Sequence, residues 1–136
     1  MNRIIGIDFG LSKVGIAISD PSGIISMPLE VIRYKEQKDL VENLKRIASE
    51  RNVKTLVIGY PLSMNYKENK MTEIIDKFKS VMEKNNFDIH LEDERLSSQY
   101  AKKIMIQQNI KTGTNKEMVD VLSASIILQT YLDRKK

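Results

Sequence analysis

Acidic side chains occur at three places where an apolar core would not hold an unpaired charge. Asp8 closes one apolar run, Asp93 and Glu94 follow a second, and Asp120 directly precedes a third. Carboxylate oxygens are ligands for Mg²⁺ and Mn²⁺, and two such ions about 4 Å apart can activate water and stabilise a leaving oxygen at phosphorus. The chain has no cysteine and one histidine, His90. Metal-assisted hydrolysis suits such a chain because it needs no protein nucleophile.

Each of these acids also has a plainer interpretation. Asp8 can initiate a turn before Phe9-Gly10, residues 92–94 can form a solvated acidic loop, and Asp120 can be an acid favoured by the helix dipole. Alternation along a strand places Asp93 on the face opposite to its two acidic neighbours. We therefore expect that not all three acids of this triplet reach one site.

Glu117 lies one helical turn before Asp120 and can share its face. Residues 114–117 also read T-x-x-E, a capping box in which the two side chains satisfy backbone N–H groups at a helix start. The capping role explains Glu117 without a metal, and the sequence leaves both roles open.

Short strands and amphipathic helices have to position these residues. Strands are expected at about residues 3–8, 14–19, 24–29, 54–59 and 88–91, and helices at about 38–48, 71–82, 98–109 and 115–132. The segment 20–23, Asp-Pro-Ser-Gly, predicts a turn. Three strands joined by short turns and followed by strand–helix units predict an α/β fold. Its mixed five-stranded sheet combines an antiparallel three-strand meander with two parallel strands, and helices cover both faces.

The composition is that of an ordinary globular protein with a modest excess of positive charge. The 136 residues fit a single domain spanning 1–136, with 41% hydrophobic and 29% charged residues and a net charge of +4. This charge suits a polyanionic partner such as nucleic acid but does not require one. The apolar runs are far shorter than the roughly 20 residues of a membrane helix. We therefore expect no membrane association and a cytoplasmic location.

Four segments resemble the YqgF/RuvX family, in matching order and spacing over nearly the whole chain. Its members are described as Holliday-junction-resolvase-like proteins and as nucleases of the 16S ribosomal RNA precursor. The segments are IGIDFGLSKVGIAISD at 5–20, VIGYPLSMN at 57–65, DERLSS at 93–98 and VDVLSASIILQTYL at 119–132.

The resemblance implies a ribonuclease H-like fold and metal-dependent phosphodiester hydrolysis. It places catalytic acids at Asp8, at the pair Asp93 and Glu94, and at Asp120. We expect Asp8, Glu94 and Asp120 to be the ligands of Mg²⁺ or Mn²⁺, with Glu94 favoured over Asp93 as the acid nearer the strand end.

The resemblance also implies how nucleic acid is held. Lys13 and Arg95 are the expected phosphate contacts, on a substrate that is precursor ribosomal RNA at the 5′ end of 16S or Holliday-junction-like DNA. The first loop, Leu11-Ser12-Lys13, keeps one of the two neighbouring basic residues usual in the family. The oligomeric state expected is a monomer or a homodimer.

Two other functions compete with the nuclease. A non-catalytic RNA- or ribosome-associated module could keep the same fold and bind without cutting. The segment IDFGLSK also resembles the first phosphate loop of actin-like ATPases and sugar kinases, but those proteins enclose a nucleotide between two such domains. This chain has residues for one and lacks a G-x-x-x-x-G-K-[ST] loop.

Overall fold

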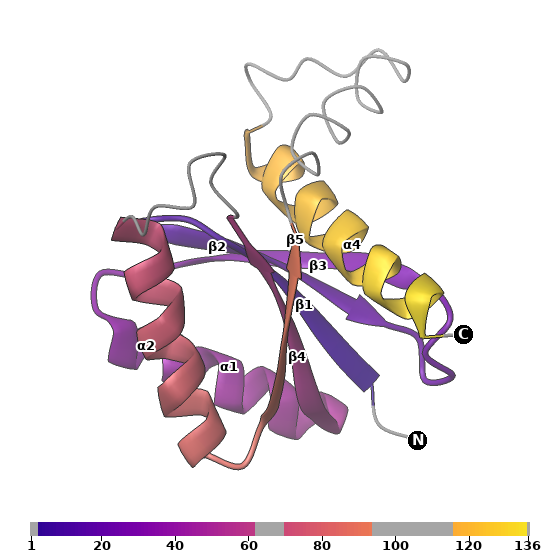
Figure 1. The fold of residues 1–136 in the computed structure, drawn as a ribbon, viewed down its shortest axis with the longest axis horizontal. Helices are drawn as coiled ribbons and strands as arrows, with labels where there is room; N and C mark the ends of the chain where they lie inside the picture. The colour runs from indigo at the N-terminus through magenta and orange to yellow at the C-terminus, as the bar shows by residue number, and fades with distance from the viewer. Residues whose placement is uncertain (1–2, 62–69, 94–115, 136) are drawn as a thin grey trace.

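The protein is built on a five-stranded mixed sheet with the strand order β3-β2-β1-β4-β5 (Figure 1). The computed structural model describes residues 3–61, 70–93 and 116–135. β1 and β3 both pair antiparallel with β2, whereas β4 runs parallel to both β1 and β5. The sheet expected from the sequence is therefore confirmed. The strands are β1 (Arg3–Phe9), β2 (Lys13–Ser19), β3 (Ser26–Arg33), β4 (Val53–Tyr60) and β5 (Asp88–Asp93).

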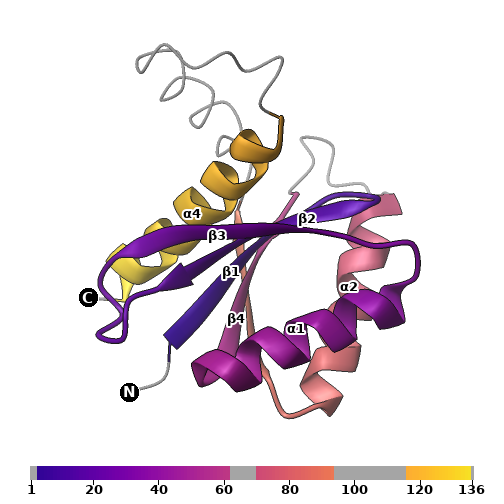
Figure 2. The same cartoon turned by 180° about the vertical axis from the view of Figure 1, so that it is seen from behind.

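Helices α1 (Gln37–Arg51) and α2 (Lys70–Lys84) cover one face of the sheet with an apolar core (Figures 1 and 2). Alternate residues of the strands point into this core because side chains along a strand alternate between faces. Phe78 of α2 is fully buried, and its ring meets the ring of Phe9 edge-on with centroids 5.1 Å apart. Strand residues in this core include Ile5, Ile7, Val14, Ile16, Leu56, Ile58 and Ile89.

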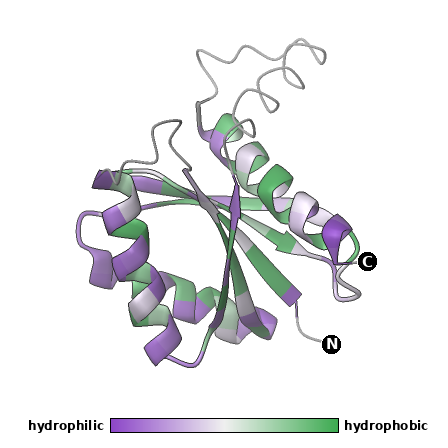
Figure 3. Cartoon of the chain, viewed as in Figure 1, coloured by the Kyte–Doolittle hydropathy of each residue, from purple (hydrophilic) through white to green (hydrophobic). Residues whose placement is uncertain are grey.

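Helix α4 (Lys116–Arg134) covers the opposite face and carries hydrophobic residues along most of its length (Figures 1 and 3). A smaller apolar cluster forms there, in which Ala17 and Val57 of the sheet meet Ala124, Ile127, Leu128, Tyr131 and Leu132 of the helix. Gly6 allows this helix to approach closely, since a β-carbon at Gly6 would lie 2.6 Å from Leu128 Cβ.

All five strands differ in extent from the expectation, and β3 differs most, since it ends at Arg33 rather than at residue 29. β1 continues through Phe9, because Phe9 pairs with Val14 and buries its ring. β3 begins at Ser26 rather than at residue 24, because Asp20 Oδ1 accepts hydrogen bonds of 2.8 Å from the N–H groups of both Ile24 and Ile25. The expected turn therefore extends to Ile25 and leaves both isoleucines exposed.

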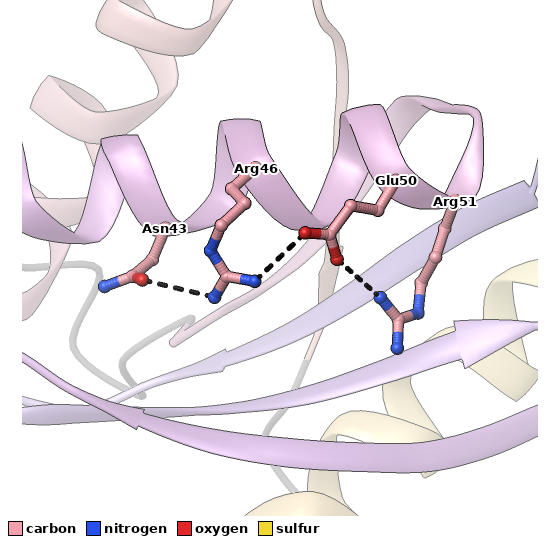
Figure 4. Close-up of polar contacts among 4 residues, drawn as sticks. All are labelled: Asn43, Arg46, Glu50 and Arg51. Atoms are coloured by element: carbon pink, nitrogen blue, oxygen red, sulfur yellow. Dashed lines mark hydrogen bonds and ion pairs between the residues drawn. The ribbon is translucent and has the colours of Figure 1, made fainter.

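The solvent-facing side of α1 holds charges that pair within the helix. Arg46 lies 3.4 Å from Glu50, which in turn lies 3.5 Å from Arg51, and Asn43 accepts a further hydrogen bond from Arg46 (Figure 4). Exposed pairs of this kind contribute at most about 1 kcal/mol each. None of the helices in the described part of the chain is both long and apolar enough to cross a membrane.

Candidate active site

Asp8 lies in β1 on the face that α4 covers. Its neighbours Ile7 and Phe9 point into the α1/α2 core, so alternation turns the Asp8 side chain the other way. Asp8 pairs in register with Gly15 of β2, and directly opposed residues of an antiparallel pair share a face. The half-buried Asp8 is therefore placed on the polar end of the α4 face.

Asp120 of α4 lies directly over Gly15. A β-carbon added at Gly15 would overlap the Asp120 carbonyl oxygen and would lie 3.1 Å from Asp120 Cβ. Only glycine leaves room for the helix at this point. The strand position opposite Asp8 is thus a point of close approach between α4 and the sheet.

The two carboxylates are near enough to share an ion. Opposed β-carbons in an antiparallel pair lie roughly 4.5–5.5 Å apart. Adding the 3.1 Å step from Gly15 to Asp120 Cβ puts the Asp8 and Asp120 β-carbons within roughly 9 Å of each other. Carboxylates projecting from these carbons can reach one ion or an adjacent pair of ions, so the structure brings two of the expected catalytic acids together.

Lys13, the first residue of β2, makes an ion pair with Asp120. Its Nζ lies 3.0 Å from Asp120 Oδ2, and each side chain is 26% exposed. Asp120 Oδ2 is itself fully buried, and no group in the described part of the chain gives it a hydrogen bond of good geometry. The contact with Lys13 is therefore a charge–charge contact without hydrogen-bond alignment, and it leaves the lone pairs of this oxygen poorly satisfied.

The loop that carries Lys13 is anchored by Tyr34. The Tyr34 hydroxyl donates a 2.8 Å hydrogen bond to the Gly10 carbonyl oxygen, and the Tyr34 N–H donates to the Ser12 carbonyl oxygen at 2.9 Å. Burial raises the pKa of Tyr34, so the hydroxyl stays protonated as a donor. The start of β2, and with it Lys13, is held in a fixed place at the sheet end.

A second ion pair joins α4 to the same end of the sheet. Arg33 of β3 pairs in register with Lys13 and donates a 2.9 Å hydrogen bond to Glu117 Oε1. This pair is more exposed, at 66% for Arg33 and 54% for Glu117. The Glu117 carboxylate is thus engaged with β3, and Thr114, the other half of the expected capping box, lies outside the described residues.

Asp93 points away from the Asp8–Asp120 pair. Ile89 of the same strand packs in the α1/α2 core, so Asp93, four residues on, has the same orientation and is exposed. Asp93 pairs in register with Tyr60 of β4 and stands two strands from β1. A direct role of Asp93 at the metal stays a prediction that this orientation disfavours.

Glu92 faces the α4 side but already has a cation within the chain. It is 5% exposed and takes hydrogen bonds of 2.9 and 2.6 Å from the two terminal nitrogens of Arg134. Glu94 and Arg95 lie outside the described residues, as does the helix expected at 98–109. Their assigned roles remain predictions.

The donor set fits Mg²⁺ or Mn²⁺. Mg²⁺ is usually held by one or two carboxylates and keeps several waters, and Asp8 and Asp120 supply that number. The buried, poorly satisfied Asp120 Oδ2 is an oxygen for which a cation is a suitable partner. Over residues 3–61, 70–93 and 116–135, no group of three or more His, Cys, Asp or Glu side chains that could hold a metal is found, so a third ligand of these types is not among them.

Gly15 is the site residue that the sequence reasoning missed. It faces Asp8, admits Asp120 and follows Lys13 by two positions. A signal was available in the chain, because Gly6 and Gly15 interrupt the two most apolar strands. Glycine in a strand interior often marks the close approach of another backbone.

The comparisons with known proteins identify the family of this chain. A family profile described as "RuvX: Holliday junction resolvase" matches residues 2–134. The chain belongs to the RuvX family. The family predicted from the sequence is therefore confirmed. Membership of the RuvX family makes the chain a nuclease.

Curated relatives of this RuvX chain match over nearly their full length. A protein of Ruminiclostridium cellulolyticum named "Putative pre-16S rRNA nuclease" is 42% identical over 134 residues, which cover 97% of this chain and 94% of the relative. A protein of Mycoplasmopsis synoviae with the same name is 41% identical over 137 residues, covering 98% and 99%.

Solved structures confirm the ribonuclease H-like resolvase fold. The Fowlpox virus resolvase, solved with Holliday junction DNA, matches with a TM-score of 0.64 at 12% identity and covers 98% of both chains. RuvC of T. thermophilus with a Holliday junction substrate gives 0.61 at 11% identity, covering 98% of this chain and 95% of RuvC. At this identity the likeness concerns the fold alone.

Proposed function

We propose that this RuvX protein is a divalent-metal-dependent endonuclease that hydrolyses phosphodiester bonds of structured nucleic acid. The observation that carries the proposal is the placement of Asp120, with its buried Oδ2, over the strand position opposite Asp8. Two carboxylates from distant parts of the sequence meet at one sheet end, beside a lysine.

The chain's own residues have separate tasks in this mechanism. Asp8 and Asp120 hold the metal, together with an acid from the 93–94 doublet, for which Glu94 is our choice. Lys13 and Arg95 bind backbone phosphates and orient the scissile bond. A Mg²⁺ or Mn²⁺ ion held by these carboxylates would supply activation of the attacking water and stabilisation of the charge on the leaving oxygen. No side-chain nucleophile is required.

The substrate we propose is the 16S ribosomal RNA precursor at its 5′ end, with Holliday-junction-like DNA as the competing substrate. The names of the curated relatives support the first. The family description supports the second. A cytoplasmic protein acting as a monomer or a homodimer fits either substrate.

Cleavage of labelled substrates tests the proposal. Precursor 16S RNA and a four-way DNA junction are incubated with the protein in Mg²⁺ or Mn²⁺, with EDTA as the metal-free arm. We expect cutting of one substrate by the wild type and a loss of at least about 100-fold in Asp8→Asn, because the substitution removes a charged ligand. Asp39→Asn is the matched control, since Asp39 is an exposed acid on α1. This variant should cleave the substrate as fast as the wild type.

The same variant separates a catalytic Asp8 from a structural one. If Asp8 and Asp120 are crowded acids, Asp8→Asn should leave the melting temperature in metal-free buffer unchanged or raise it by relieving repulsion. A clearly lower melting temperature would make Asp8 a structural residue. Binding that survives Asp8→Asn, with no cutting in either metal, would replace the nuclease with the non-catalytic binding module.

A further inference from the structure

Among the residues that the structure describes, Lys13 supplies the cation that contacts Asp120 Oδ2. Its Nζ lies 3.0 Å from this oxygen, which is fully buried and has no well-aligned hydrogen bond from the described residues. We propose that the Lys13 ammonium group and the divalent ion compete for Asp120 Oδ2, so that Lys13 is the internal counter-ion of the site and is displaced when metal binds. This inference rests on the metal site of the proposed function.

The competition follows from the geometry of a single oxygen. An ion that coordinates Asp120 Oδ2 lies close to the Lys13 ammonium, which is 3.0 Å from the same oxygen, so the two cations repel each other at short range. A lysine is suited to such an exchange because its ammonium is a point charge on a flexible four-carbon stem. At 26% exposure the Lys13 side chain has solvent beside it into which the ammonium can move.

The neighbouring ion pair, Arg33 with Glu117, shows how the Lys13–Asp120 pair differs from an ordinary surface pair. Arg33 stands beside Lys13 in register and pairs with Glu117, one helical turn before Asp120. That pair has good hydrogen-bond geometry and is more than half exposed, so solvent screens it and its carboxylate is already satisfied. Both pairs hold the start of α4 to the sheet, but only the Lys13 pair includes a buried, poorly satisfied oxygen.

Displacement gives Lys13 a second partner. Once the metal holds Asp120, the ammonium lies at the rim of the site, where a phosphate oxygen of the nucleic acid can replace the lost carboxylate. Metal binding would therefore expose one phosphate contact, and nucleic acid would in turn stabilise the metal-bound form, since such coupling is reciprocal. One lysine then serves as counter-ion without metal and as phosphate ligand with it.

Mn²⁺ binding measured by electron paramagnetic resonance tests the inference on the full chain without nucleic acid. We expect Lys13→Met and Lys13→Gln to bind Mn²⁺ about three- to tenfold more tightly than the wild type, the factor that corresponds to removing a competing ion pair worth about 1 kcal/mol. Arg33→Met removes the same charge one strand away and should stay within about twofold of the wild type. Circular dichroism confirms that each variant is folded.

The outcomes separate the two proposals. Equal or weaker Mn²⁺ binding by both folded Lys13 variants would overturn the competition while leaving the metal site intact. An equal gain in Arg33→Met would also overturn it, because general charge repulsion would then explain the change. If the wild type binds no Mn²⁺, or if Asp8→Asn binds as well as the wild type, it is the proposed metal site itself that fails.

Discussion

The two faces of the sheet are built on opposite principles. On the α1/α2 face, large apolar side chains from all five strands pack against two helices, and Phe78 is buried completely. On the α4 face, two glycines bring one helix down onto the backbone, and polar groups such as Asp8 and Asp120 lie at the end of that contact. The first face holds the larger apolar core, and the second combines a smaller apolar cluster with the close placement of two carboxylates.

This division explains why the site can tolerate charge. Clustered carboxylates destabilise a folded protein, and the apolar core on the far side of the same strands offsets that cost. Asp8 stands between Ile7 and Phe9, so one β1 segment contributes to both faces at once. Substitutions on the two faces should therefore separate stability from metal binding.

The largest loss of stability is expected from Phe78→Ala. Removing a fully buried aromatic ring from the α1/α2 core should lower the free energy of unfolding by about 3–5 kcal/mol, through lost burial and the cavity left behind. Urea denaturation measures this loss. The fraction that remains folded should bind Mn²⁺ as the wild type does, and a weakened site in that fraction would mean that the two faces are not independent.

In contrast to Phe78→Ala, Gly15→Ala should weaken Mn²⁺ binding and cost less stability. The new β-carbon would overlap the Asp120 carbonyl oxygen, so α4 must shift, at a cost of about 1–3 kcal/mol typical of overpacking. Mn²⁺ affinity should fall at least tenfold because Asp120 moves away from Asp8. Gly23→Ala serves as a control for the loss of a glycine, since a β-carbon there meets nothing within 4 Å and the cost is confined to its positive φ. If Gly15→Ala binds Mn²⁺ as tightly as the wild type, the close approach of α4 at Gly15 is not needed for the metal site.

The elements of both faces could be predicted from the sequence, but the contacts between them could not. Periodicity predicted the sheet, α1, α2 and α4, and motif positions predicted Asp8 and Asp120 as partners. The pairing of Lys13 with Asp120 joins residues more than 100 positions apart and depends on how α4 crosses the sheet, which no local pattern encodes. Nor does the sequence predict that Glu92 pairs with Arg134, because alternation gives Glu92 a face but not the position of the end of α4 on that face.

A smaller effect is expected at that internal pair. Arg134→Met leaves the buried carboxylate of Glu92 without its cation, and because the arginine itself is 61% exposed we expect a loss of about 1–2 kcal/mol rather than the larger cost of a fully buried pair. Arg46→Met on α1 is the matched control, since its partner Glu50 is 52% exposed and the loss there should stay below about 0.5 kcal/mol. Equal losses at the two sites would show that burial of Glu92 carries no penalty.

The smallest effect is a dependence on pH at the β2–β3 turn, far from the site on the α4 face. The N–H of Ile25, then the Ser22 hydroxyl and the N–H of Ile24, hold the pKa of Asp20 well below its usual value of 3.8. Because the folded state favours the ionised carboxylate more than the unfolded state does, this stabilisation is fully present above the unfolded pKa. It is lost progressively as the pH falls below about 4.

Asp20→Asn tests this pH dependence. The amide keeps an acceptor oxygen for the two N–H groups but removes the charge, so the variant should be less stable than the wild type at pH 7. The difference between the two should shrink as urea denaturation is repeated at pH 4, 3 and 2. Gln129 of α4 accepts a hydrogen bond from Ser26 N–H and donates one to the Ile24 carbonyl oxygen beside this turn. These contacts lie toward the end of the helix opposite Asp120. Mn²⁺ affinity at pH 7 should therefore be unaffected, and a change would mean that this end of α4 also controls the carboxylate pair.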